Sequence, residues 1–163
     1  MAKSKIIRQY KNKIVSELSQ DDEIIKGLGL NPDESPDDLV WVRLYPHNYI
    51  PQTESEVKSY ITVEVNIPQR RLRYGENSSS IWTHPYIIFR VICHQEDMKL
   101  DLAGESGTRM DYLAELVEDK YEGRQDFGVG VLTLISDVAG DINNTYRVRE
   151  LVFEAVDVSG VCG

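Results

Sequence analysis

Residues 85–94, PYIIFRVICH, decide the fold, because they form the strongest strand pattern in the chain. One face of the predicted strand carries Ile87, Phe89, Val91 and Cys93, and the other carries Ile88, Arg90, Ile92 and His94. A strand that is apolar on both faces is typical of the middle of a sheet, so we expect a central strand here. Cys93 is expected in the core, and His94 on the opposite face, at the strand surface or strand end.

Working outward, residues 60–67 predict a neighbouring strand with one buried and one wet face. Ile61, Val63, Val65 and Ile67 alternate with Tyr60, Thr62, Glu64 and Asn66. Residues 39–44 predict a further strand that ends before Pro46. Residues 129–135 and 146–158 predict two more, joined as an antiparallel hairpin by a turn rich in Gly140, Asp141, Asn143 and Asn144.

Three helices are expected around these strands. Ile7, Tyr10, Ile14 and Leu18 form one apolar stripe on a helix over residues 5–18. Asp21 or Asp22 can cap a short helix to Leu28 that stops at Gly29, and Thr108 can cap a helix followed by Gly123. The prediction is one α+β domain over residues 1–163, with residues 1–30 as an N-terminal helical arm. Its sheet is largely antiparallel or mixed, with about four to five strands and helices packed on one face.

Charge is distributed in blocks along the 163 residues, which carry 18 basic and 27 acidic side chains and a net charge of −9. Residues 1–13 contain five bases and no acid, whereas residues 14–39 contain eight acids against Lys26 alone. Such blocks are either solvated faces or complementary surfaces of neighbouring copies in an assembly. The acidic balance argues against broad affinity for nucleic acid. The sequence has neither a transmembrane segment nor a secretory signal, so we expect synthesis in the cytoplasm and no membrane partner.

The residue types that carry catalysis or bind cofactors are scattered. His47, His84 and His94 lack the spacing of a metal site, and Cys93 and Cys162 predict neither a disulfide framework nor a ligand pair. No phosphate-binding glycine loop is present. We therefore expect no catalytic residue, no cofactor and no metal, and the chain is not predicted to be an enzyme.

Residues 69–85, QRRLRYGENSSSIWTHP, are expected to form a long exposed loop. The segment contains three arginines, Arg70, Arg71 and Arg73, and one acid, Glu76. Tyr74 and Trp82 add aromatic rings. Arginine with tyrosine and tryptophan is enriched at protein interfaces, so these five residues are the candidate interface. A mobile loop without a partner and a direct contact with nucleic acid are the alternatives.

Three segments carry a resemblance to a known family: IWTHPYIIFRVICHQ (81–95), GTRMDYLAELVEDKY (107–121) and RELVFEAVDV (149–158). With the N-terminal helix and the extended loop before them, they resemble the tail-terminator, or tail-completion, proteins of long-tailed bacteriophages. The resemblance covers most of the chain and rests on length and element order.

The resemblance implies a structural virion protein at the tail–neck junction, made in the cytoplasm of the bacterial host. It implies a ring, hexameric in such proteins, that caps the tail tube, stops tube polymerisation and joins the tail to the head–neck connector. The implied partners are other copies of the chain, the tail tube protein, a neck or head-completion protein and, in tails that have one, the sheath. DNA is expected to pass through the ring without specific binding, along a lumen lined by the wet face with Tyr60 and Glu64. The alternatives are a head-completion or neck adaptor protein and a small regulatory or nucleic-acid-binding module.

Overall fold

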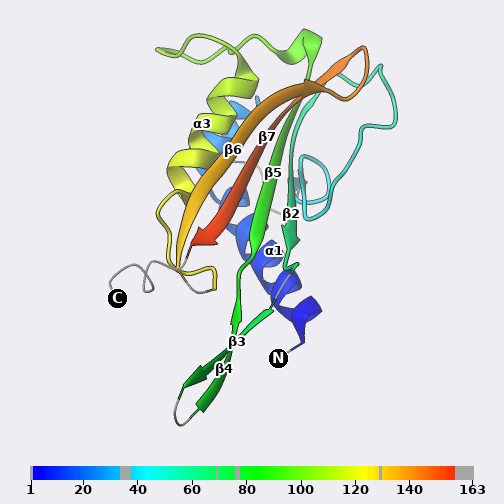
Figure 1. The fold of residues 1–163 in the computed structure, drawn as a ribbon. Helices are drawn as coiled ribbons and strands as arrows, with labels where there is room; N and C mark the ends of the chain where they lie inside the picture. Colours follow the sequence, from blue (N-terminus) through cyan, green and yellow to red (C-terminus); the bar gives the residue numbers. More distant parts are fainter. Residues whose placement is uncertain (1, 34–37, 69, 76–77, 129, 157–163) are drawn as a thin grey trace.

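The computed structural model describes residues 2–33, 38–68, 70–75, 78–128 and 130–156, with the backbone alone between residues 70 and 83. Figure 1 shows a twisted sheet with helices on one side and a hairpin that extends beyond its lower end. The helices are α1 (Lys3–Ser19), α2 (Asp22–Gly27), the 3-10 helix η2 (Gln95–Asp97) and α3 (Arg109–Tyr121). The strands are β1 (Leu44–Tyr45), β2 (Ser59–Asn66), β3 (Arg70–Gly75), β4 (Ser78–Thr83), β5 (Tyr86–His94), β6 (Val131–Asp141) and β7 (Tyr146–Val156).

The main sheet has the strand order β1-β2-β5-β7-β6 and is mixed. β1 runs parallel to β2, and the remaining neighbours are antiparallel. β5 lies in the middle, where Phe89 is registered with Val63 on one side and Leu151 on the other. Its core face is fully buried, and this confirms the central strand.

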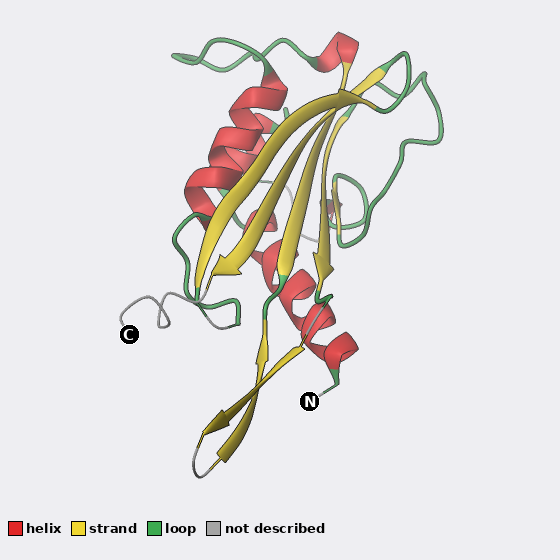
Figure 2. Ribbon diagram, viewed as in Figure 1, coloured by secondary structure: helices red, strands yellow, loops and turns green. Residues whose placement is uncertain are grey.

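The helices cover one face of this sheet, as the side-by-side layers in Figure 2 show. Ile14 and Leu18 of α1 are buried in the same core cluster as Leu113 and Val117 of α3. Phe89 of β5 packs against the α3 ring of Tyr121, with 4.8 Å between the ring centroids. Burial of one apolar stripe from each helix against one sheet face gives the expected α+β fold.

The predicted helix ends are confirmed. The Asp21 carboxylate accepts hydrogen bonds from the backbone N–H groups of residues 23 and 24, and the Thr108 hydroxyl accepts one from Asp111 N–H. Gly29 and Gly123, just beyond α2 and α3, have φ values of 82° and 81°. Local capping chemistry therefore sets these boundaries.

The strand predicted over residues 39–44 is wrong except at its end. The carbonyl of Leu39 accepts hydrogen bonds from the N–H groups of Val42, Arg43 and Leu44, which closes a tight turn. Trp41, inside the turn, has a φ of 69°. Only Leu44 and Tyr45 join the sheet, because those hydrogen bonds turn the preceding backbone back on itself. The β6–β7 hairpin is confirmed, although β6 continues through Gly140 to Asp141.

The wet face predicted for β2 is also wrong at one end. His94 ends β5, as one of its two predicted positions has it, but it is buried and not at the surface. The connection between β1 and β2 folds over this end of the outer face, so Tyr60, Thr62 and His94 are buried. His94 Nδ1 accepts a hydrogen bond from Glu96 N–H, and Nε2 lies 3.0 Å from the carbonyl oxygen of Glu54. Period-two alternation could not reveal this second layer, because it comes from a distant loop.

Candidate protein interface

The candidate interface lies on a β-hairpin rather than the loop predicted over residues 69–85. β3 and β4 pair antiparallel from Arg70 opposite Thr83 to Gly75 opposite Ser78 and form their own two-stranded sheet. The loop prediction failed because these strands lack the alternation of apolar and polar residues that marks a strand with a buried face. We call this element the β3–β4 hairpin. It is inserted between the neighbouring core strands β2 and β5 and projects away from the main sheet (Figure 1).

The five predicted interface residues fall on both strands of the hairpin. Arg70, Arg71, Arg73 and Tyr74 lie on β3, and Trp82 lies on β4. The register places position 71 directly opposite position 82. Because successive strand residues alternate between faces, positions 71, 73, 80 and 82 share one face of the ribbon, and positions 70 and 74 share the other. The backbone thus groups Arg71 and Arg73 with Trp82 and separates them from Arg70 and Tyr74.

The root of the hairpin is held by the main sheet. Ala155 N–H of β7 donates to the Pro85 carbonyl, and His84 Nδ1 lies 3.2 Å from the Ala155 carbonyl oxygen. Ile67, just after β2, is buried with 2% exposure. These contacts give the hairpin a fixed base.

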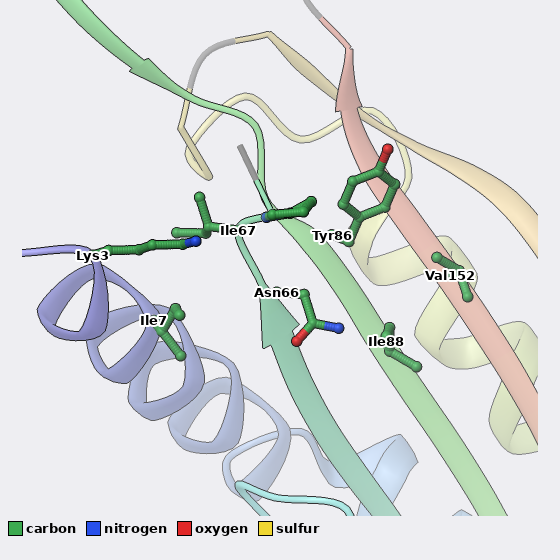
Figure 3. Close-up of a pocket in the computed structure, with 8 residues that line it drawn as sticks. Lys3, Ile7, Asn66, Ile67, Tyr86, Ile88 and Val152 are labelled. Atoms are coloured by element: carbon green, nitrogen blue, oxygen red, sulfur yellow. The ribbon is translucent and has the colours of Figure 1, made fainter. Parts of the chain in front are cut away.

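An open groove of about 560 Å³ lies beside this root (Figure 3). It runs between the first turn of α1 and the uncovered end of the outer sheet face, and Lys3 extends along it toward Ile67. The lining is mostly apolar and consists of Lys3, Ile7, Asn66, Ile67, Pro68, Tyr86, Ile88 and Val152. The hairpin, the groove and the start of α1 therefore form one continuous end of the molecule.

This end is basic. Lys3, Lys5 and Arg8 are exposed, and within the described ranges no carboxylate pairs with them. The next two lysines of α1 are neutralised inside the chain, Lys11 by Glu64 and Lys13 by Asp126. With the three arginines of the β3–β4 hairpin, the start of α1 concentrates positive charge on a chain whose net charge is negative.

Part of the acidic segment from residue 14 to 39 is neutralised within the same chain. Glu17 accepts two hydrogen bonds from Arg124, and Asp21 accepts one from Lys120 at 2.8 Å. Burial opposes the charge on Asp21, but the bonds from Lys120 and from backbone N–H groups outweigh it and lower the pKa of this carboxyl. Fewer acidic side chains are therefore free to pair with a neighbouring copy than the sequence indicates.

The exposed turn before β1 was not predicted from the sequence. Trp41 is 61% exposed and Val42 is 43% exposed, and the indole ring lies 5.6 Å from the His47 ring between centroids. A non-glycine residue in the left-handed region costs roughly 1 to 3 kcal/mol, and such strain gathers at functional positions. The pattern gave no signal for this site, because residues 39–44 are as apolar as a buried strand.

Neither a metal site nor a reactive thiol is found among the described residues. Among them, no group of three His, Cys, Asp or Glu side chains is placed to hold a metal ion. Burial raises the pKa of the Cys93 thiol to about 12, which keeps it protonated and unreactive. No helix within the described ranges has the length and apolar character needed to cross a membrane.

Comparison with known proteins finds one protein family, YomW, which matches residues 10–155. The chain belongs to the YomW family. YomW is a family of phage-derived proteins. None of the curated proteins matches the chain. The YomW match includes the Trp41 turn and the whole β3–β4 hairpin, whereas Lys3, Lys5 and Arg8 lie before it.

Proposed function

We propose that this YomW-family chain is a structural virion protein that forms a ring, a hexamer, on the end of the phage tail tube. The ring stops tube polymerisation and joins the tail to the head–neck connector. It acts through contacts between proteins and carries out no reaction. DNA passes through the ring without specific binding.

The observation that carries this proposal is the β3–β4 hairpin. An isolated two-stranded hairpin is at best marginally stable in water. We therefore expect a hairpin that projects from the main sheet to be stabilised by contact with a partner. Its sequence is rich in arginine and aromatic residues, which supply directional hydrogen bonds and flat contact area at interfaces. The phage origin of the family supports an assembly partner from the virion.

The ring would stop growth by symmetry. A head-to-tail contact whose rotation closes after six copies leaves no free end, and a ring that fits the last tube layer on one side only gives the next tube subunit no matching surface. Two residues were expected to line the lumen along β2. Tyr60 is buried, and Glu64 is paired with Lys11. We therefore assign no strand to the lumen.

The test combines the purified chain with a tail tube protein from the same phage. Light scattering gives the mass of the chain alone and with tubes, and negative-stain imaging shows where it binds. Rings on tube ends, together with tubes of limited length, are the expected result. The control replaces the three hairpin arginines together (Arg70→Ser, Arg71→Ser and Arg73→Ser), which is expected to leave the body folded and weaken ring formation.

Other outcomes point elsewhere. A chain that ignores tubes and binds capsid portals is a head-completion or neck adaptor protein. A chain that binds DNA with strong salt dependence is a nucleic-acid-binding module. Either result overturns the terminator function.

A further inference from the structure

The turn before β1 presents a tryptophan to solvent in a fixed conformation. We define the Trp41 surface as Trp41, Val42, the adjoining His47 and the exposed Asp38. Trp41 N–H donates to the Leu44 carbonyl at 2.9 Å, and the Leu39 carbonyl holds three further N–H groups. Leu39 itself is anchored in the core with 1% exposure. The backbone that carries the indole is therefore fixed before any partner arrives, which reduces the entropy lost on binding.

The segment that leads to Trp41 is acidic in sequence. Residues 27–42 contain four acids and no basic residue, and Asp33 and Asp38 are exposed. Arg43 follows, but its guanidinium donates to the carbonyls of Leu28 and Ser59. A flat indole beside carboxylates is a surface that suits arginine, because guanidinium groups stack on aromatic rings and pair with carboxylates. The partner should therefore present arginines on a rigid element.

The β3–β4 hairpin has that chemistry. Arg71 and Arg73 share one face of the ribbon with Trp82, and Glu76 is the one acid in residues 69–85. Charge complementarity thus matches the hairpin to the Trp41 surface.

The hairpin is poorly placed to reach the Trp41 surface of its own chain. β1, which follows the Trp41 turn, pairs with Ile61 near the start of β2. The hairpin leaves β2 after Asn66, at the opposite end, and points further away (Figure 1). At about 3.3 Å per residue these points are roughly 17 Å apart before the hairpin begins. The occupant is therefore a second copy.

We propose that the Arg71 and Arg73 face of the β3–β4 hairpin in one copy docks on the Trp41 surface of the next copy. This inference rests on the proposed ring and names the surface that closes it. Because the two surfaces differ, the contact is head-to-tail and can repeat around a ring.

Crosslinking between two cysteine variants tests the contact directly. One variant carries Ser80→Cys on the Arg71 face, and the other carries Val42→Cys beside Trp41. Both also carry Cys162→Ser, and Cys93 stays because it is buried. The mixed variants are treated with a short bismaleimide at high protein concentration, and dimers are separated by gel electrophoresis. We expect a crosslinked dimer in the mixture at least about tenfold more abundant than in either variant alone.

Two matched controls define the faces. Ser79→Cys lies next to Ser80 on the other face of the hairpin. Val138→Cys replaces a valine that is 60% exposed on β6, at the opposite edge of the sheet from β1. Both controls should crosslink less than the Ser80 and Val42 pair. Equal crosslinking of either control overturns the inference.

Failure of this contact and failure of the ring are distinguishable. If rings form on tubes but the Ser80 and Val42 pair does not crosslink, the hairpin docks elsewhere and the ring stands. If the pair crosslinks but no ring or tube-end binding is seen, the contact stands and the terminator function fails. If neither is observed, both are overturned.

Discussion

Arg109 is a charged side chain held almost completely inside the fold, with 7% exposure. Its guanidinium donates to the carbonyl of Gly27 at the end of α2 and, at 2.8 Å, to the carbonyl of Asp97 in η2. The Asp97 carboxylate lies 3.6 Å from Nε. One side chain at the start of α3 thus ties three elements together. Removing one partner of such a buried network leaves polar groups without partners.

We expect Arg109→Met to lower the free energy of unfolding by roughly 3 kcal/mol, because methionine fills similar space but donates no hydrogen bond. Urea denaturation followed by circular dichroism measures the change. Lys99→Met is the control, since Lys99 is exposed and its loss should cost less than about 0.5 kcal/mol. Equal stability of the two variants would show that the hydrogen bonds of Arg109 do not stabilise the fold.

The backbone strain at Trp41, whose φ is 69°, gives a second prediction. Trp41→Asn and Trp41→Ala both lose the ring contact with His47, but asparagine adopts the left-handed conformation more readily than alanine. We expect the asparagine variant to be more stable by about 0.5 to 1 kcal/mol in urea denaturation. If the alanine variant is as stable, the turn relaxes and Trp41 is not held under strain.

Residues were predictable from the sequence where the deciding interaction is local. Asp21 and Thr108 were identified as caps because a cap needs only the following backbone N–H groups. The burial of His94 was not predicted, because it depends on a loop 40 residues away in the sequence. The exposure of Trp41 was not predicted either, because its turn is closed by local backbone hydrogen bonds in a segment whose apolar residues match a strand. The charge blocks overstated the number of free acids, because Lys120 and Arg124, about 100 residues away in the sequence, neutralise Asp21 and Glu17.

At the scale of elements, α1, α3 and β5 were predictable because each buries a periodic apolar face in the core. The β3–β4 hairpin was not, although the five candidate interface residues all lie on this one element. Residue type identified the candidate site, and only the backbone pairing showed which members share a face.

The hairpin should be separable from the body. We expect replacement of residues 70–83 by a short Gly/Ser link to change the free energy of unfolding by less than about 1 kcal/mol, because the core lies in the main sheet and helices. Thermal and urea unfolding measure this, and light scattering with tubes should show loss of the ring. Loss of the folded state would mean that the hairpin belongs to the core structure.

At the scale of the whole molecule, ion pairs join α1 to the segment that follows α3. Hydrogen bonds from Arg124 and Lys13 hold the pKa of Asp126 well below its usual range, and Lys13 and Arg124 also lie over the Phe127 ring. A carboxyl whose pKa is lowered by folding stabilises the fold above its unfolded pKa of about 3.9, and this contribution is lost as pH falls through the folded value.

We therefore expect the urea midpoint to fall as pH drops from about 4 to 2. Asp126→Asn removes one of the groups with a lowered pKa, so its midpoint should fall less steeply over the same range. Because the Asp126 side chain is 42% exposed, added salt should reduce the difference between the two proteins. Identical pH profiles for both would exclude Asp126 from the acid response.

A head-to-tail contact between unlike surfaces makes a last prediction about assembly. A copy that keeps its hairpin but carries Trp41→Asn can only dock its hairpin on another copy. A copy that keeps Trp41 but lacks residues 70–83 can only receive a hairpin. Each variant alone should remain a monomer, and the mixture should form a dimer that cannot grow, because neither free surface of that dimer has a match. A single contact holds less tightly than a closed ring, so sedimentation velocity at high concentration is the suitable measurement. Rings in the mixture, or dimers of either variant alone, would show that copies meet through like surfaces instead.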